Sequence, residues 1–579
     1  MMKYEVGFPT SFLYETGEIR TMIFTELPYK RVDFDEVERI YSDLIFRAKN
    51  AKSGEELFAV HKERYVMQGD ITTNFLLAHI RRDMDTTDEF YMKEMEYYDE
   101  KLPVLSKQDL EYEKTLYESP HREYMEEKLG KVTFKNMELS FKSFDEKLIP
   151  LSQEENQLVS RYTKLIASAE IPFDGEVYNL SLMTPFTTSS DREVRKRAWK
   201  AVSDYFMTVT DEIDEIYDLM VKNRTEQARL MGYDNFVELG YYRMGRNCYD
   251  KEMVENFRKQ VKEYFVPFVE KLHRVRRERL GVDALKYYDN GVYFPNGNPA
   301  PTGTPEEILE SGREMYHELS KETADFFDYM MEHGLFDVLG RKNKRAGGYM
   351  TFIPNYKFPF IFANFNGTSG DVNVITHECG HAFQRYLVKD EEITEFTNLT
   401  METAETHSMS MEYFTYQWMD KFFGERKVDY LDMHFMDSVI FIPYGTMVDE
   451  FQHHVYENPD MTPKERKELW ARLEKEYRPS LDYEDDPFFG QGGFWQKQGH
   501  IFQSPFYYID YVIAGVCAMQ FKGMMDENYG EAWEKYVKLC RLAAKDFFVN
   551  AVKEVGLASP FEDGCMEGLV KQLEKGVAF

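Results

Sequence analysis

Apolar residues recur at a helical period over most of the chain. Residues 37–48 follow this spacing, and so do residues 254–272, where Pro267 predicts a kink and Gly281 predicts the end of the helix. The pattern therefore predicts a mostly α protein. Capping boxes, which predict helix starts, occur at Ser190 to Glu193 and at Thr304 to Glu307.

Strand patterns are confined to two places. Residues 171–182 contain Asp174-Gly175, a dipeptide typical of the two-residue turn that closes a hairpin. Residues 358–365 are apolar but contain Pro359, which cannot donate a backbone hydrogen bond, so this run is predicted to be an edge strand. An edge strand leaves backbone groups with which an extended peptide can pair.

The charge balance limits the classes of partner. The chain has 71 basic and 102 acidic side chains among 579 residues, a net charge of −31. Such a field repels nucleic acid and anionic membranes, so neither is an expected partner. Aromatic residues make up 16% of the chain, which fits either a large aromatic core or a cleft lined with rings.

Cysteine usage and the N-terminus bear on the compartment. The five cysteines are widely spaced with no CxxC pair, which indicates free thiols in a reducing compartment. Glu5 and Glu15 interrupt the N-terminus, which has no apolar core of a signal peptide, and no run of 18 apolar residues could span a membrane. We therefore expect a cytoplasmic protein.

The decisive motif is His377-Glu378-Cys379-Gly380-His381. Two histidines four residues apart on a helix face the same side and can reach one zinc ion, while Glu378 can lean over a water on that ion. Cys379 points off this face and is expected to pack in the core. The alternative, two surface histidines on an amphipathic helix, is less favoured because Ser369-Gly370-Asp371 offers a helix start and the apolar pattern continues beyond it.

A catalytic zinc ion usually takes a third protein ligand. Downstream, Glu402, Glu405 and Glu412 fall on one face of a predicted helix, with His407 nearly opposite Glu405. Their setting among small and methionine residues suggests that they are buried, and a buried carboxylate needs a partner such as zinc. Spacing alone does not choose among the three glutamates.

At these positions the sequence resembles the zinc oligopeptidases that include thimet oligopeptidase and oligoendopeptidase F, most closely the Pz-peptidase-like oligoendopeptidases. Residues 377–381 match the family's HExGH, and Glu405 to Glu412 match its E-x-x-S-x-x-x-E motif. The resemblance implies that His377, His381 and Glu405 bind one Zn²⁺ per chain. It leaves Glu402 and Glu412 as possible acceptors for the ligand imidazoles.

The resemblance also covers segments outside the metal helices. Gly347-Gly348-Tyr349 and the strand up to Phe365 resemble the family's substrate-side strand. Gly499-His500, followed by an aromatic run, resembles its His-then-Tyr segment, which implies that His500, Tyr508 and Tyr511 face the scissile bond. Gln384 stands where many members have a third histidine that is not a needed ligand.

The implied protein is a zincin-type metallopeptidase with a helical N-terminal lobe, a catalytic lobe with a small β-sheet, and a deep cleft between them. The boundaries expected along the chain are 1–165 for the helical lobe, 166–290 for a helical and hairpin segment that continues it, and 291–579 for the zinc catalytic domain. Loop-rich residues 289–304 mark the last boundary. Residues 482–499 are glycine-rich but lack the Lys-Ser/Thr of a phosphate loop, so nucleotide binding is not expected.

The expected activity is endohydrolysis of short oligopeptides, with Glu378 as general base and His500, Tyr508 and Tyr511 as catalytic residues. Two alternatives stay open. One is a zinc exopeptidase, either a carboxypeptidase or a dipeptidase, on the same scaffold. The other is a non-catalytic peptide-binding protein whose zinc is structural, against which the intact Glu378 argues.

Overall fold

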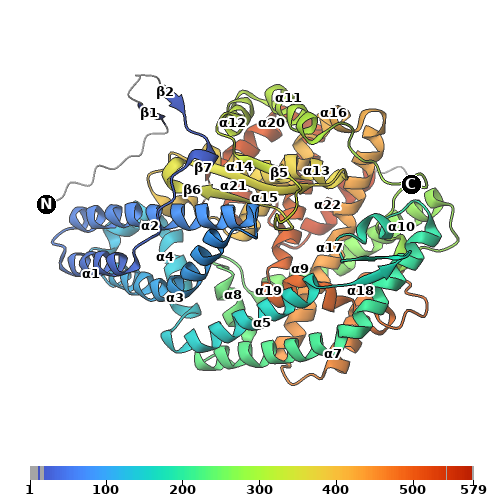
Figure 1. The fold of residues 1–579 in the computed structure, drawn as a ribbon, viewed down its shortest axis with the longest axis horizontal. Helices are drawn as coiled ribbons and strands as arrows, with labels where there is room; N and C mark the ends of the chain where they lie inside the picture. The colour runs from blue at the N-terminus through green and yellow to red at the C-terminus, as the bar shows by residue number, and fades with distance from the viewer. Residues whose placement is uncertain (1–10, 14–18, 543, 577–579) are drawn as a thin grey trace. The chain divides into compact units, whose positions relative to one another are not determined.

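The structure is a computed structural model that describes residues 11–13, 19–542 and 544–576. The expectation of no signal peptide rests on residues such as Glu5 and Glu15, which lie outside the described residues. Most described residues are helical, which confirms the mostly α prediction (Figure 1). Within these ranges, no helix is both long enough and apolar enough to cross a membrane.

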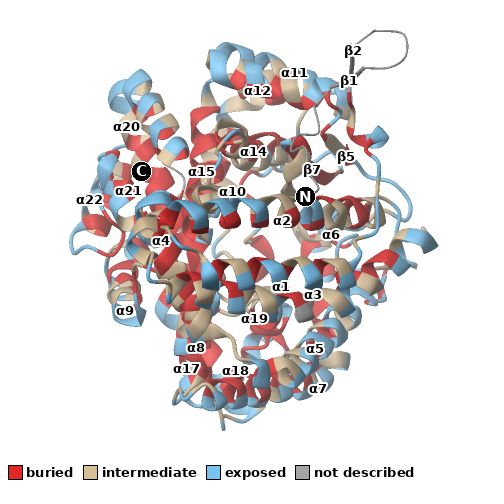
Figure 2. Ribbon diagram, turned by 90° about the vertical axis from the view of Figure 1, so that its left-hand side faces the viewer, coloured by how far each residue is buried: buried red, intermediate tan, exposed pale blue. Residues whose placement is uncertain are grey.

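The chain divides into two compact units, each assembled from separate segments. Unit 1 comprises residues 1–138, 300–427 and 528–555, and unit 2 comprises residues 139–299, 428–527 and 556–579. The division expected at residues 165 and 290 follows the order of the chain and stays a prediction. Helix α1 (Phe34–Asn50) buries one face and exposes the other, as its colours show in Figure 2.

Unit 1 combines long helices with a small sheet. The predicted helix over residues 37–48 is confirmed within α1, which is capped by the side chain of Asp33. The helices of this unit are α1 (Phe34–Asn50), α2 (Gly54–Met84), α3 (Glu89–Tyr117), α4 (Arg122–Ser143, which passes the boundary), α11 (Pro305–Leu319), α12 (Lys321–Glu332), α13 (Ser369–Asn373), α14 (Cys379–Leu387), α15 (Met401–Phe414), α16 (Asp420–Phe423) and α21 (Phe548–Glu554). Short strands β1 (Ser11–Leu13) and β2 (Ile19–Thr21) form an antiparallel pair.

The sheet of unit 1 has the order β5-β7-β6, from strands β5 (Phe336–Leu339), β6 (Tyr349–Ile353) and β7 (Phe358–Phe365). The edge position expected for residues 358–365 is therefore wrong, because β7 is the central strand. Pro359 is tolerated there because β5 pairs with β7 only from Ile361 onward, where the Ile361 N–H bonds to Leu335 O at 2.9 Å. An N–H group at position 359 would point to the same side of β7 as the Ile361 N–H group, where β5 does not extend.

Most described residues of unit 2 are helical. Its helices are α5 (Ile149–Ala167), α6 (Thr184–Thr187), α7 (Arg192–Leu230), α8 (Phe236–Arg243), α9 (Lys251–Gln260), α10 (Val266–Leu280), α17 (Lys427–Glu457), α18 (Pro463–Tyr477), α19 (Gly499–Gln503), α20 (Tyr508–Leu542) and α22 (Cys565–Lys575). A π-helical turn at Val261–Phe265 joins α9 to α10 and places Pro267 in the first turn of α10. Gly281 ends α10 at φ 65°, as predicted.

A hairpin in unit 2 confirms the predicted turn. Strands β3 (Ile171–Phe173) and β4 (Glu176–Tyr178) pair across Asp174-Gly175, both at positive φ (48° and 91°). The α20 helix is interrupted at Asn528 (φ −155°), where the chain passes from unit 2 back to unit 1.

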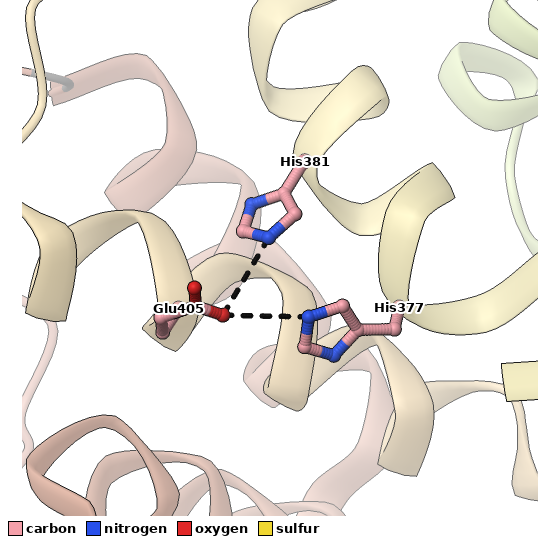
Figure 3. A group of neighbouring side chains, drawn as sticks. All are labelled: His377, His381 and Glu405. Atoms are coloured by element: carbon pink, nitrogen blue, oxygen red, sulfur yellow. Dashed lines mark ion pairs between the residues drawn. The ribbon is translucent and has the colours of Figure 1, made fainter. Parts of the chain in front are cut away.

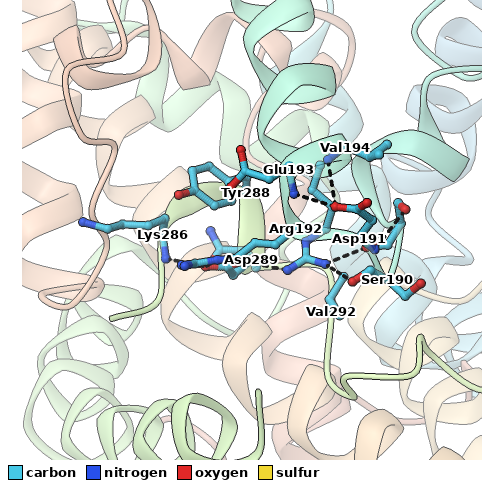
Figure 4. A network of polar contacts seen from close by, with 12 residues as sticks. Ser190, Asp191, Arg192, Glu193, Val194, Lys286, Tyr288, Asp289 and Val292 are labelled. Atoms are coloured by element: carbon cyan, nitrogen blue, oxygen red, sulfur yellow. Dashed lines mark hydrogen bonds and ion pairs between the residues drawn. The ribbon is translucent and has the colours of Figure 1, made fainter. Parts of the chain in front are cut away.

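The start of α7 differs from its predicted capping box. Asp191, and not Ser190, is the N-cap, and its carboxylate accepts from the backbone N–H groups of Glu193 and Val194. Figure 4 shows this cap beside Arg192, which reaches the buried carboxylate of Asp289. The box at Thr304 and Glu307 is confirmed at α11.

Candidate functional site

The two motif histidines lie where a π-helical turn, Val374–Glu378, runs into α14. The helix start expected at Ser369-Gly370-Asp371 is confirmed, because α13 begins at Ser369, and Thr368 is its N-cap. Asp371 accepts from the backbone N–H groups of Asn366 and Gly367 at 2.9 and 2.8 Å, which fixes the turn between β7 and α13. The strand and the helix are thereby joined by a rigid corner directly before the histidines.

Helix α15 carries the candidate third ligand against α14. A Cβ at Gly380 would lie 2.7 Å from Ser408 Cα and 3.0 Å from Met411 Cβ, closer than atoms normally pack. Glycine at this position therefore allows the two helix backbones to approach. On α15, the Ser408 hydroxyl donates to Glu405 Oε2 at 3.1 Å and orients the carboxylate.

Three donor atoms converge in this region (Figure 3). Glu405 Oε2 lies 3.3 Å from His377 Nε2 and 3.5 Å from His381 Nε2. A tetrahedral zinc ion with bonds of about 2.0–2.1 Å separates its ligand atoms by about 3.4 Å, so both distances suit a shared ion. Among the described residues, His377, His381 and Glu405 form the one group of three such side chains whose ligand atoms lie within 4.8 Å of one another.

The carboxylates around His377 set its charge and orientation. Glu412 Oε1 lies 2.6 Å from His377 Nδ1, so Nε2 is turned toward Glu405. Burial alone would lower the pKa of His377, but hydrogen bonds and charges from Glu405 and Glu412 raise it well above its ordinary value. Burial would raise the pKa of Glu405, but the two imidazoles hold it well below its ordinary value.

The remaining acids and the cysteine take other positions. Glu402 is buried, and Thr400 Oγ1 donates to its carboxylate at 2.6 Å. Glu378 is half-buried in the π-helical turn, one residue before the fully buried Cys379. Burial raises the pKa of the Cys379 thiol well above its ordinary value, which fits the packing role expected for it. The amide of Gln384 is also buried and donates to Cys540 O at 3.2 Å.

The other sequence-predicted residues form a second cluster, in unit 2. The rings of His500 and Tyr508 have centroids 4.8 Å apart, and Tyr511 lies 6.0 Å from His500 and 5.9 Å from Tyr508. We call these three residues the His–Tyr cluster. The structure thus brings together the three metal-binding candidates in unit 1 and, separately, the His–Tyr cluster in unit 2.

Two further side chains, Tyr444 and Gln498, which the sequence did not predict, contact the His–Tyr cluster. Tyr444 donates its hydroxyl to Gln498 Oε1 at 2.7 Å, which turns the amide nitrogen of Gln498 toward His500 Nδ1 at 2.9 Å. Burial lowers the pKa of His500 and raises the pKa of Tyr508, so both are neutral at pH 7. Gln498 stands two residues before His500, and that proximity was its only signal in the sequence.

Comparisons with known proteins agree along most of the chain. Residues 24–144 match the peptidase M3 N-terminal domain, and residues 186–539 match peptidase family M3. An oligoendopeptidase F homolog of Borreliella burgdorferi is 22% identical over 70% of this chain and 71% of its own length. The plasmid-encoded oligoendopeptidase F of Lactococcus lactis subsp. cremoris is 20% identical over 91% of both chains.

A solved structure is much more similar. PZ peptidase A, determined with an inhibitor, is 46% identical to this chain. The match covers 96% of this chain and 98% of that one, with a TM-score of 0.91.

Proposed function

This chain belongs to peptidase family M3 and is a metallopeptidase, and we propose that it is a zinc-dependent endopeptidase that hydrolyses short oligopeptides. The observation that carries the proposal is the convergence of His377 Nε2, His381 Nε2 and Glu405 Oε2 at separations that suit one ion. Two imidazoles and one carboxylate are the donor set of many catalytic zinc sites, which keep a fourth position for water or substrate.

The chain's own residues orient a ligand histidine and transfer the proton. Zinc, when bound, lowers the pKa of a coordinated water toward ~7 and polarises the scissile carbonyl. Glu412 holds His377 Nδ1 and so keeps Nε2 available as a ligand atom. Glu378 accepts a proton from the attacking water on its carboxylate and returns it to the nitrogen of the leaving amine.

We assign the His–Tyr cluster to the oxyanion that develops on the substrate. Because Gln498 donates to His500 Nδ1, the neutral imidazole carries its proton on Nε2 and can donate from there. Tyr508 keeps its phenolic proton because burial raises its pKa. Such donors, aimed at the charge that forms in the transition state, typically contribute ~10²–10³ in rate each.

The backbone of the substrate also needs a partner. Because β7 is central, the strand pairing expected for an edge strand falls to an outer strand. We assign it to β6, which directly follows Gly347-Gly348 and pairs with β7 on one side. Recognition through main-chain hydrogen bonds suits an enzyme that accepts varied side chains.

The test is hydrolysis of a ten-residue peptide that is acetylated at its N-terminus and amidated at its C-terminus. We expect mass spectrometry to show internal cleavage that a chelator abolishes and added Zn²⁺ restores. Glu378→Gln should keep the metal and lose at least ~10²-fold in kcat, since general base catalysis contributes ~10²–10⁴. Glu392→Gln, a change at an exposed glutamate of unit 1, is the matched control and should keep full activity.

Two outcomes would contradict the proposal. The same peptide with free termini is the comparison substrate. Cleavage of this unblocked peptide but not of the blocked one would indicate an exopeptidase. One zinc ion per chain with no hydrolysis of either peptide would indicate a peptide-binding protein in which the metal is structural.

A further inference from the structure

A cavity of about 220 Å³ lies in unit 2 next to the His–Tyr cluster. We call it the Arg478–Lys497 cavity. Its volume equals that of roughly seven water molecules at ~30 Å³ each, enough for part of a peptide. The lining residues are Tyr444, Arg478, Phe494, Lys497 and Gln498.

Lys497 is a cation with no acidic partner in the part of the chain that the structure describes. Among the described residues, no carboxylate lies within ion-pair distance of its ammonium group, which instead lies 5.7 Å from the ring centroid of Trp199 and 5.9 Å from that of Phe494. The side chain is accessible, but the protein atoms around it desolvate the ammonium and lower its pKa. An isolated cation of this kind stands out in a chain with a net charge of −31.

Arg478 adds a second positive charge that its neighbours neutralise only weakly. Its ion pair with Glu474 is long, at 3.9 Å, and the Glu474 carboxylate accepts the Tyr483 hydroxyl at 2.6 Å. Burial raises the pKa of Glu474. The guanidinium lies 5.4 Å from the centroid of the Tyr444 ring, and none of the described residues that line the cavity is acidic.

We propose that the Arg478–Lys497 cavity binds a carboxylate of the peptide substrate. The planar guanidinium can hold a carboxylate through two parallel hydrogen bonds, and the ammonium adds a point charge. The rings of Tyr444 and Phe494 provide an apolar wall for the residue that carries the carboxylate.

Two lining residues, Tyr444 and Gln498, link the cavity to the His–Tyr cluster, and the Tyr444 ring lies 6.0 Å from the Tyr508 ring. Gln498 lines the cavity and also hydrogen-bonds His500 Nδ1. A carboxylate held by Arg478 and Lys497 would therefore fix the substrate beside a residue that we assign to the oxyanion. This inference rests on the proposed peptidase function and specifies which peptides the enzyme prefers.

The test compares two pairs of peptides. The two peptides of the first pair differ only in their C-terminus, which is a carboxylate in one and an amide in the other. The peptides of the second pair are both amidated and differ only in carrying Glu or Gln at one position. This second pair is repeated with the Glu or Gln at successive positions. We expect the wild-type protein to favour the charged member of one pair roughly tenfold in kcat/KM, as a charge-assisted hydrogen bond would give. The C-terminal pair and the Glu/Gln pair distinguish the two sources of the carboxylate.

The variants then locate the preference. In Lys497→Met and Arg478→Gln, the charged-to-neutral ratio of kcat/KM should fall toward one, whereas Lys497→Arg should retain it. Lys464→Met is the matched control, because Lys464 is 85% exposed at the start of α18, the opposite end from Arg478, and its loss changes the net charge equally. A ratio that falls as much in the Lys464 variant would assign the effect to the general field and overturn the proposal.

The outcomes separate this inference from the proposed function. If the wild-type protein cleaves both members of every pair equally, the carboxylate site is wrong and the peptidase stands. If it cleaves none, the peptidase fails, and calorimetric binding of the free acid and the amide still tests the cavity. Equal affinity for both members of each pair would then overturn the site.

Discussion

Each nitrogen of the His377 ring faces a carboxylate. Glu405 lies at Nε2 and Glu412 at Nδ1, and the two acids come from the same helix, α15. Seven residues separate them, two helical turns, so one helix supplies both a candidate ligand and the group that orients its neighbour. This geometry explains why several glutamates are needed on a single face of α15.

The three glutamates of α15 should differ in their effect on metal binding. We expect Glu405→Ala to lose most of the bound zinc, because Glu405 Oε2 faces both imidazoles. Glu412→Ala should weaken zinc binding by ~10–100-fold, the usual effect of losing a group that orients a ligand histidine. Glu402→Ala is the comparison variant. The zinc content of all three variants is measured after dialysis. Loss of zinc in Glu402→Ala with retention in Glu405→Ala would contradict the ligand assignment.

The tyrosines of the His–Tyr cluster should act on turnover more than on binding. We expect Tyr508→Phe or Tyr511→Phe to lower kcat by ~10²-fold with a smaller change in KM, because the lost donor would act on charge that develops during the reaction. Steady-state kinetics on the blocked peptide measures both constants. Unchanged rates in both variants would remove tyrosine from the mechanism.

At this scale the sequence predicted what local spacing controls. The interval between His377 and His381 is a property of one helix, so it could be read directly. The choice among Glu402, Glu405 and Glu412 depends on how α15 lies against α14, and spacing alone left it open. Tyr444 was missed because it acts through a contact with a distant segment of the chain, whereas Gln498 was missed although it lies two residues before His500.

At the scale of elements, the contact between α14 and α15 controls the distance from the histidines to Glu405. Gly380→Ala would place a methyl group against the Ser408 backbone, which a flexible side chain cannot relieve. We expect this variant to lose ~1–3 kcal/mol of stability and to bind zinc more weakly. Thermal unfolding and zinc titration measure the two effects.

Gly568→Ala is the matched control for this change. Gly568 lies in α22, and a Cβ there would meet no atom within 4 Å. Because alanine favours a helix over glycine, this variant should unfold at the same or a higher temperature. Equal destabilisation by both substitutions would show that close packing at Gly380 is not the cause.

An ion-pair network joins three helices of unit 2 and should make stability depend on pH. Glu155 of α5 pairs with Arg224 of α7 at 2.7 Å and with Arg243 of α8 at 3.2 Å. Burial alone would raise the pKa of Glu155, but the two arginines lower it to about 2. This stabilisation is fully present above the unfolded pKa of ~4.3 and is lost as the pH falls toward about 2.

Glu155→Gln should therefore unfold more easily at pH 7, by about 3 kcal/mol, and its stability should fall less steeply between about pH 5 and pH 2. Urea unfolding at a series of pH values measures both quantities. Glu468→Gln is the control, because Glu468 pairs with Lys464 at 3.6 Å on the surface with 63% of its side chain exposed. Parallel pH curves for wild type and Glu155→Gln would contradict the role of this network.

The sequence predicted the types of the elements better than their neighbours. Asp174-Gly175 specified its hairpin because the turn needs positive φ at both residues. Pro359 indicated that one backbone N–H donor of the strand is missing. It did not indicate that the neighbouring strand β5 would begin to pair with β7 only at Ile361. The cap of α7 shifted by one residue, from the predicted Ser190 to Asp191, because neighbouring side chains compete to cap the same backbone groups.

At the scale of the whole molecule, each unit joins segments that are far apart in the chain. Unit 1 combines residues 1–138 with 300–427 and 528–555. Hydrophobic periodicity reports which face of a helix is buried but not which distant segment covers it. A division of this kind therefore depends on long-range packing that no local pattern in one sequence contains.

Because all three candidate ligands lie in unit 1, removing the metal should act unevenly on the molecule. A metal present at a thousand times its dissociation constant stabilises the folded state that binds it by ~4 kcal/mol, so chelation should speed local opening near the ligands by up to about a thousandfold. Hydrogen exchange should then increase in α14 and α15 and much less in α7 and α18 of unit 2. Glu405→Ala, which already lacks the metal, should show no response to chelator. An equal increase in both units would mean that the ion does not stabilise unit 1 in particular, and the three-residue site would then be wrong.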